Sequence, residues 1–429
     1  MTPRLSRRKF GALTAAAIPS FWVAGNWRLS GSEGPEGPAS FINPLIGAST
    51  NQTLGEGKTF PGPATPFGMV QLGPDTITAG DNAPGYSFEH KTIEGFSFTR
   101  MSGVGWYGDF GNLQIMPTVG PMKLACGRVD RPGEGWRSRF RHETELARVN
   151  YYSVTLDDSG IRAELTAAPR GGMLLFTFPK SGQSRIQIDL ARRIGGTSLR
   201  QFVKVVNEHV IEAWMKCPSS GGGWGNGEGN VDYTVYFHTE FSKPLERFGV
   251  WKIDVPDTAF PVRHGLVTNY FQSDAYYDLV RRGQVLDRCV EQEGNHVGFF
   301  LEFPTHAGEQ VTVKSGISFV GVEGARNNLA HDIPAWNFAD VRRRGVSLWN
   351  AVLGAVEIEG ASDTQKVIFS TALYHAMLDP RLVSDVDGRY RAADKAIRTT
   401  EKYSSRTIFS GWEVFRAQFP LLTLLNPTS

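Results

Sequence analysis

Residues 152–190 read YSVTLDDSGIRAELTAAPRGGMLLFTFPKSGQSRIQIDL, and the alternation within this stretch decides the fold class. Apolar and polar residues alternate in three short runs, at 152–156, 161–165 and 185–190. A period of two residues is typical of a β-strand with one buried face. Asp and Gly residues separate the runs, as expected for turns between neighbouring strands. The stretch therefore predicts consecutive antiparallel strands.

The same pattern extends on both sides, from about Phe41 to Phe319. Further runs of strand-like sequence occur at 233–237, 297–301 and 311–313. Strand and helix patterns do not alternate repeatedly, and this argues against a parallel, doubly wound sheet. Many short strands punctuated by turns are typical of a sandwich. We therefore predict an N-terminal antiparallel β-sandwich over residues 41–332.

After residue 332 the apolar period becomes helical. Apolar residues recur at helical spacing over the next segment and predict a helical linker at 333–360. A second helical pattern starts at Ser362, a suitable N-cap, and runs until Pro380. A third helical pattern occupies 412–425. Together, the second and third patterns predict the beginning of a helical domain over 361–429. Two helices and part of a third cannot close such a domain around a core, so we expect the domain to be truncated.

The composition excludes several classes of protein. The 45 Lys and Arg residues against 43 Asp and Glu residues give a net charge of +2, so no nucleic-acid partner is indicated. Three cysteines in 429 residues cannot form a disulfide scaffold. The nine histidines lack HxxxH or HExxH spacing, and no Gly-x-Ser-x-Gly elbow occurs. We predict neither a transition-metal site formed by local sequence nor a serine hydrolase, while a site for a hard, oxygen-bound cation stays open.

The N-terminus has the layout of an export signal. A basic segment leads into an apolar stretch of small residues that ends near Gly25, which predicts a signal peptide at 1–25. The run Ser6-Arg7-Arg8-Lys9-Phe10 resembles a twin-arginine signal, although two adjacent arginines also occur in ordinary basic signals. Residues 26–40 are rich in Gly, Ser and Pro and are predicted to be a flexible lead-in. We expect a periplasmic or secreted protein with no membrane span after the signal is removed.

Two loop segments are candidate binding sites. The tract SSGGGWGNGEGN at 219–230 lacks the Lys-Ser/Thr and the following helix of a phosphate loop, so it is interpreted as a long hairpin loop. Residues 57–120 interleave aromatic rings with Gly, Pro and polar side chains. Flat rings beside directional polar groups suit a sugar, whereas a tightly packed loop layer would show the same composition. Both interpretations stay open on composition alone.

Several segments of this chain resemble glycoside hydrolase family 92, the calcium-dependent exo-acting α-mannosidases. The similar segments follow the order of the family from residue 41 to residue 427. They include FINPLIG (41–47), TFPG (59–62), PFGMVQL (66–72), SGVG (102–105), YYSV (151–154), WGNG (224–227), GISFV (316–320), VEGAR (322–326), TALYH (371–375), SDVDGRY (384–390) and FSGWEVFR (409–416).

The resemblance implies a fold, a reaction and a cofactor. It implies an N-terminal β-sandwich, a helical linker and a C-terminal (α/α)6 barrel, with sugar bound between sandwich and barrel. The family chemistry is inverting hydrolysis of terminal α-mannosides, such as the α-1,2-mannose of N-glycans. A mannose-containing glycan is therefore the expected partner. Calcium is the family cofactor and is expected to distort the bound mannose and stabilise the transition state.

The resemblance also indicates which residues line the sugar site. Phe60, Trp106, Tyr107 and Trp412 would stack on sugar rings, and Asp109, Glu413 and Arg416 would recognise hydroxyls. Glu413 departs from the family, which usually has Asp there. The family's general acid, base and most calcium ligands lie beyond the position matching Ser429, so we predict no catalytic residue and no metal ligand in this chain. The alternative function is a non-catalytic carbohydrate-binding or inactive truncated product.

Overall fold

The computed structural model describes residues 37–51, 53, 57–76, 84–102, 110–194, 196–217, 232–256, 272–407 and 414–425. All of them belong to one compact unit, Pro35–Ser429. The predicted signal peptide lies outside the described residues. The predicted flexible lead-in ends in a short 3₁₀ helix, η1 (Pro38–Phe41), whose Ala39 amide donates to Asn350 Oδ1 at 2.9 Å. Residues 38–40 are therefore ordered by a contact that a local sequence pattern does not contain.

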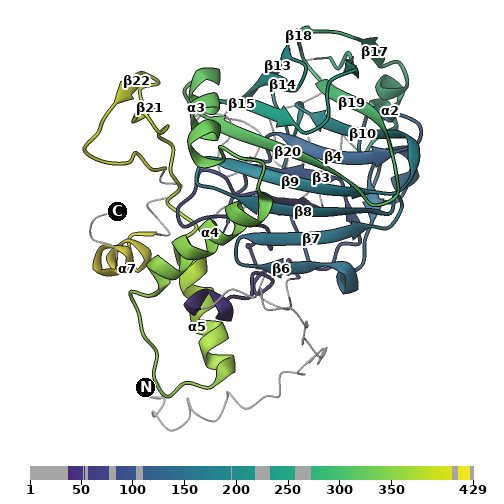
Figure 1. Ribbon diagram of the computed structural model, residues 1–429. Coiled ribbons are helices and arrows are strands. Elements are labelled where there is room, and N and C mark those ends of the chain that lie inside the picture. The colour runs from purple at the N-terminus through teal and green to yellow at the C-terminus, as the bar shows by residue number, and fades with distance from the viewer. Residues whose placement is uncertain are drawn as a thin grey trace, which may run out of the picture. The chain divides into compact units, whose positions relative to one another are not determined.

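Two large antiparallel sheets form most of the unit (Figure 1). The first has seven strands, in the order β1 (Gly73–Asp75), β3 (Gly95–Ser97), β4 (Gln114–Val119), β10 (Ser181–Asp189), β19 (Val297–Thr305), β16 (Arg247–Lys252) and β17 (Gln284–Asp287). The second has nine strands, in the order β18 (Glu291–Gly294), β13 (Arg200–Asn207), β14 (Val210–Cys217), β15 (Tyr233–Phe241), β20 (Glu309–Ser318), β9 (Gly171–Phe178), β8 (Ile161–Ala167), β7 (Tyr151–Leu156) and β6 (Leu146–Arg148).

Smaller elements connect and extend these sheets. Three two-stranded pairs are β2 (Thr92–Ile93) with β5 (Ser138–Arg139), β11 (Arg192–Arg193) with β12 (Gly196–Thr197), and β21 (Arg389–Arg391) with β22 (Ile397–Thr399). The remaining helical turns are η3 (Pro132–Glu134) and η4 (His142–Thr144), and a short helix, α2 (Asp274–Arg281), precedes β17.

The inner faces of the two sheets pack against each other through aromatic side chains. Phe96 of β3 contacts Phe176 of β9, with ring centroids 6.3 Å apart. Phe178 of β9 contacts Phe303 of β19 at 5.5 Å. All four rings are buried. The predicted antiparallel β-sandwich is therefore confirmed, and each of the six quoted strand runs lies largely or wholly within an observed strand.

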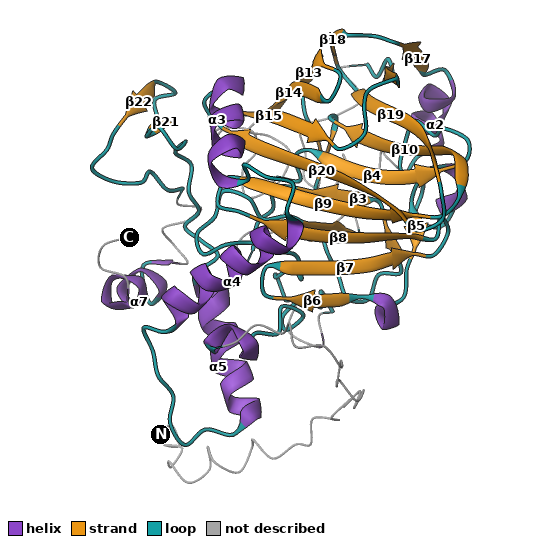
Figure 2. Ribbon diagram, viewed as in Figure 1, coloured by secondary structure: helices purple, strands orange, loops and turns teal. Residues whose placement is uncertain are grey.

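Two helices pack against one end of the nine-stranded sheet, as Figure 2 shows. Helix α3 (Val322–Asp332) lies on β20 and β15, and helix α4 (Phe338–Leu353) lies on β8. Gly316 of β20 allows this close approach, because a Cβ there would lie 2.7 Å from Leu329 Cβ. A second small core forms beneath the helices from Ala168, Met173, Leu329, Ile333 and Val341.

The remaining helices agree in part with the sequence patterns. Helix α5 (Asp363–Ala376) begins at Ser362, whose side chain forms a capping box with Gln365 as the predicted cap requires. Helix α7 (Gln418–Leu425) is shorter than the predicted 412–425, because residues 415–417 form a turn. Pro420 lies in the first turn of α7, where the missing amide hydrogen is tolerated. No helix of the described residues is long and apolar enough to cross a membrane.

Candidate functional site

The loop 66–71 of the sandwich contacts the end of α5, and we call the region around this contact the junction. Phe67 donates its amide to Met377 O at 2.8 Å and accepts at its carbonyl from the Leu382 amide at 2.8 Å. Gln71 Nε2 donates to Leu378 O at 3.0 Å. Phe67 has a φ of +53°, which is uncommon for a residue with a bulky side chain. Its backbone is held in this conformation by hydrogen bonds on both sides.

Arg381 lies at the centre of the junction and is 1% exposed. Its Nη1 donates to Arg100 O at 2.7 Å, and its Nε donates to Asp379 Oδ1 at 2.9 Å. Its guanidinium carbon lies 4.7 Å from the centre of the Phe110 ring. Its backbone carbonyl accepts from the Thr407 amide at 2.9 Å. One side chain thus contacts both the sandwich and the helical segment.

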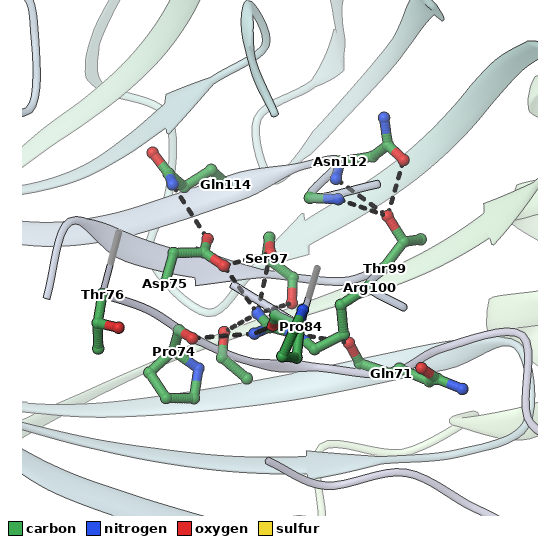
Figure 3. A network of polar contacts seen from close by, with 12 residues as sticks. Gln71, Pro74, Asp75, Thr76, Pro84, Ser97, Thr99, Arg100, Asn112 and Gln114 are labelled. Atoms are coloured by element: carbon green, nitrogen blue, oxygen red, sulfur yellow. Dashed lines mark hydrogen bonds and ion pairs between the residues drawn. The ribbon is translucent and has the colours of Figure 1, made fainter. Parts of the chain in front are cut away.

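Arg100 is itself fully buried and organises the sandwich side of the junction (Figure 3). Its guanidinium donates to five backbone carbonyls of the strand and loop region around it, including Pro74 O at 2.9 Å and Pro84 O at 2.8 Å. It also pairs with Asp75 Oδ1 at 2.9 Å. Asp75 accepts further bonds from Ser97 and Gln114. Burial raises the pKa of Asp75 to about 6, although the Arg100 charge opposes this shift.

Two further arginines lie at the junction, Arg406 on the helical side and Arg170 in the sandwich loop between β8 and β9. Arg406 stacks its guanidinium over the Phe67 ring at 4.8 Å, and Arg170 donates from Nε to Ser384 O at 2.9 Å. Burial lowers the pKa of both arginines, and the positive charge of Arg170 lowers the pKa of Arg406 further. Asp385 accepts from Ser318 Oγ at 2.8 Å and from Asn328 Nδ2 at 2.7 Å, and burial raises its pKa.

Three aromatic rings form a half-buried cluster next to Arg381. Phe110 lies 5.4 Å from Tyr233 and 6.5 Å from Phe319, measured between ring centroids. The Tyr233 hydroxyl is within 3.2 Å of Arg193 Nη1. Apolar ring faces beside guanidinium and hydroxyl groups are the chemistry that a sugar-binding surface uses.

Comparison with known families identifies the chain. A model described as the glycosyl hydrolase family 92 N-terminal domain matches residues 41–318, and a model described as the family 92 catalytic domain matches residues 324–429. The chain belongs to glycoside hydrolase family 92. The resemblance predicted from the sequence is therefore confirmed. The first match ends with β20, and the second begins in the first turn of α3.

Solved family 92 enzymes share this fold. An α-mannosidase of the family from Bacteroides thetaiotaomicron is 33% identical, has a TM-score of 0.77, and aligns over 90% of this chain and 47% of its own. It has also been solved in complex with mannoimidazole. An inverting mannosidase of the family from B. thetaiotaomicron VPI-5482 is 23% identical, with a TM-score of 0.70 over 91% of this chain and 46% of its own. The latter likeness shows the fold alone.

A curated relative is an uncharacterized secreted glycosidase of Arthroderma benhamiae (strain ATCC MYA-4681 / CBS 112371). It is 23% identical over 356 residues, which are 80% of this chain and 41% of that protein. The family 92 chain described here thus spans less than half the length of each of these relatives.

The predicted sugar-site residues lie in different environments in this family 92 chain. Phe60 is fully buried, and its ring lies 5.2 Å from the Arg100 guanidinium carbon. It supports Arg100 and has no exposed face on which a sugar could stack. Arg416 is exposed in the turn before α7, with its guanidinium over the Phe415 ring at 5.4 Å. The other five lie outside the described residues: Trp106, Tyr107, Asp109, Trp412 and Glu413.

The junction residues were missed by sequence reasoning. Arg381 and Arg100 are separated by 281 residues, so no local pattern connects them. The sequence pattern predicts only a helix end at Pro380 and predicts no role for the arginine that follows it. A signal did exist at Arg100, since a charged residue directly after the strand-like run Phe96-Ser97-Phe98-Thr99 must either be exposed or find partners inside.

A calcium site does not fit the described residues. No group of three or more His, Cys, Asp or Glu side chains in this part of the chain is arranged to hold a metal ion. The acidic residues of the junction are already paired: Asp379 bonds to Arg381, and Asp385 bonds to Ser318 and Asn328. We therefore assign no described residue to calcium and derive no step of a reaction through it.

Proposed function

We propose that this chain acts in the hydrolysis of terminal α-mannosides, with a mannose-containing glycan as the substrate. The observation that carries the proposal is the 33% identity, over 90% of the chain, to a family 92 α-mannosidase of known structure. The inverting reaction would require one carboxylic acid to protonate the leaving oxygen and one carboxylate to activate water. No described residue is assigned to either role.

The proposal includes an arrangement for the sugar site. We propose that α5 and α7 are the first helices of an (α/α)6 barrel and that the sugar binds between this barrel and the sandwich. Trp106, Tyr107 and Asp109 would contact it from the sandwich, and Trp412, Glu413 and Arg416 from the helical side. The contacts of Arg381 with Arg100, Phe110 and Thr407 support this arrangement, because residues 100, 110 and 407 flank the two segments concerned.

We further propose that the protein is exported, through a twin-arginine-type signal in residues 1–25. The basic segment and apolar stretch of that region support this proposal, as does the description of the A. benhamiae relative as secreted. Fusion of residues 1–40 to a reporter that is active only after export would test it. Replacement of Arg7 and Arg8 by Lys should then abolish the reporter signal, and an unchanged signal would contradict a twin-arginine route.

A second candidate is sugar binding without hydrolysis. The pairing of the junction carboxylates with arginine, serine and asparagine favours it, since paired carboxylates are poorly placed to transfer a proton to or from a substrate. Binding would then depend on the same side chains that are proposed above to contact the sugar.

One experiment separates the two candidates. The purified chain is incubated with an aryl α-mannoside and with an α-1,2-linked mannobiose, with calcium and with a chelator, and released mannose is measured. Binding of mannoimidazole is measured in parallel by calorimetry. Calcium-dependent release of mannose supports the hydrolase, and binding without release supports the second candidate. Neither binding nor release would contradict both.

A further inference from the structure

Three aromatic side chains form a row across the outer face of the nine-stranded sheet, and we call Phe202, Trp214 and Tyr236 the aromatic row. They belong to the neighbouring strands β13, β14 and β15, which Figure 1 shows side by side. Phe202 is the cross-strand partner of Trp214, and Trp214 is in turn the partner of Tyr236. The adjacent residues Ala213 and Val235 are buried in the core between the sheets. Because successive side chains of a strand point to opposite faces, the aromatic row faces outwards.

The rings of the aromatic row are half-buried, so each keeps part of its surface in contact with solvent. The Phe202 and Trp214 rings are parallel to within 11°, and their centroids lie 5.8 Å apart. The Trp214 indole N–H and the Tyr236 hydroxyl form no hydrogen bond with the described part of the chain. Neighbouring strands are about 4.8 Å apart, so three of them make a row about 10 Å long. The row therefore offers apolar ring surface together with two polar groups that a ligand can use.

Most charges beside the aromatic row are paired with one another. The pairs are Arg200 with Glu293, Lys204 with Glu291, and Glu212 with Arg326 of α3, at nitrogen–oxygen distances of 2.8, 3.1 and 2.6 Å. Lys216 is exposed and forms no ion pair with a residue that the structure describes. A polyanion or an acidic peptide is recognised by clustered positive charge, which paired charges do not supply. The surface therefore suits an uncharged ligand.

The size of the aromatic row argues against a protein as the ligand. A stable protein interface buries about 800 Å² on each partner, whereas one aromatic side chain has only about 150–250 Å² in total. The sheet already covers part of each ring, so the row exposes much less than such an interface needs. A glycan chain does not require so large a surface. Each of its sugar rings has a face of C–H groups that packs on an aromatic ring, and a rim of hydroxyls that bonds to polar groups nearby.

We propose that the aromatic row is a binding surface for an uncharged glycan chain. Phe202 and Trp214 pack against the C–H faces of the sugar rings, and the Trp214 N–H and the Tyr236 hydroxyl donate to sugar hydroxyls. The inference goes beyond the proposed hydrolysis, because the row shares no residue with the junction and the binding needs no catalytic group. A polymer held in this way stays on the protein through the middle of its chain.

The test is Phe202→Ala, with Phe88→Ala as the matched control. Phe88 is likewise a solvent-accessible ring in a parallel stack, since its centroid lies 4.0 Å from that of His142 at an angle of 11°. The probe is an α-mannan free of phosphate. Dissociation constants are measured by electrophoresis of the folded chain through gels that contain the mannan. Mannoimidazole is present at saturation throughout, so that it competes with a terminal mannose for the sugar site proposed above.

We expect Phe202→Ala and Trp214→Ala to raise the dissociation constant at least about fivefold, because each removes one ring on which a sugar packs. Tyr236→Phe, which removes only a hydroxyl, should raise it about threefold. Phe88→Ala should change it by less than about twofold, because the ring lies outside the row. A mannan that does not retard the unaltered chain, or retards Phe202→Ala and Phe88→Ala equally, would overturn the proposal.

Further arms keep the test decisive. If Phe202→Ala does not fold, Phe202→Leu replaces it, because leucine keeps an apolar contact with the sheet and removes the flat ring. Polygalacturonate, an anionic polymer, should retard the unaltered chain less than mannan does, and stronger retardation would contradict an uncharged ligand. Self-association in sedimentation that Phe202→Ala abolishes would assign the row to a second copy of the chain and overturn the proposal. Release of mannose tests the hydrolase separately, since these variants should leave it unchanged on an aryl α-mannoside.

Discussion

A fully buried charged side chain must find its partners inside the protein, and Arg100 does so with Asp75 and five backbone carbonyls. We predict that Arg100→Met lowers the free energy of unfolding by about 3–5 kcal/mol, because it leaves the Asp75 carboxylate buried without its partner. Urea unfolding measures the change. The control is Arg139→Met at the exposed pair with Asp158, which should cost less than about 1 kcal/mol. Equal effects in the two variants would contradict the role of Arg100.

His375 provides a prediction on pH. Burial lowers the pKa of His375 to about 4, from 6.5 for an exposed histidine. Below pH 6.5 the histidine is protonated in the unfolded chain, whereas in the folded chain it stays neutral down to about pH 4. The free energy of unfolding therefore falls as the pH drops through this range. The contribution reaches about 3 kcal/mol at pH 4.

The variant His375→Gln removes this contribution. Between pH 6.5 and pH 4 its free energy of unfolding should fall less steeply than that of the unaltered protein, as measured by urea unfolding at several pH values. His296, whose pKa burial lowers to about 3, acts in the same direction in both proteins and cancels in the comparison. Parallel slopes for His375→Gln and the unaltered protein would contradict the prediction.

At the scale of elements, the contact between α3 and β20 depends on a glycine, Gly316, which has no side chain to separate the helix from the strand. A Cβ at Gly316 would overlap the Ala325 carbonyl oxygen and crowd Leu329. We predict that Gly316→Ala lowers the free energy of unfolding by about 1–3 kcal/mol, because the helix must move away from the sheet. The control is Gly182→Ala in β10, where a Cβ meets nothing within 4 Å. A loss no greater in Gly316→Ala than in Gly182→Ala, measured by urea unfolding, would show that α3 can shift at little cost.

The sequence predicts individual strands and helices better than it predicts the contacts between them. The strands β7, β8, β10, β15, β19 and β20 follow from a period of two residues, and α5 follows from its cap at Ser362, because these signals are local. Helix α3 was included in the predicted sandwich domain, since its eleven residues contain few apolar positions and show no clear helical period. The junction could not be predicted, because its contacts join residues about 300 positions apart, as between Gln71 and Leu378.

At the scale of the whole molecule, the sandwich and the helices share one hydrophobic core. Trp349 of α4 and Tyr374 of α5 belong to the same buried cluster as Phe60 and Leu72 of the sandwich loops. The Trp349 indole donates to Ala64 O at 2.7 Å. We therefore predict a single cooperative unfolding transition, with far-ultraviolet and near-ultraviolet circular dichroism changing at the same urea concentration.

Removal of one large side chain from the shared core should uncouple the unfolding of the helices from the unfolding of the sandwich. In Trp349→Ala we expect the helical signal to be lost at a lower urea concentration than the strand signal, because a large cavity then separates α4 from the sandwich loops. Two separate transitions in the unaltered protein would contradict the prediction of one cooperative unit. One sharp transition in Trp349→Ala would show that other contacts are sufficient to couple the parts.

The long sequence separation of the junction contacts has a consequence for the order of folding during synthesis. The Arg100 network needs only residues from 71 to 114, so it can form early while the chain is still being made. The bond from Arg381 to Arg100 closes a loop of 281 residues and has to wait for almost the whole described chain. Contacts between distant residues carry a large loop-closure entropy and form late. The Arg100 carbonyl can therefore be in place well before its partner is synthesised, and the later segment that contains Arg381 then docks onto a surface formed by an earlier one.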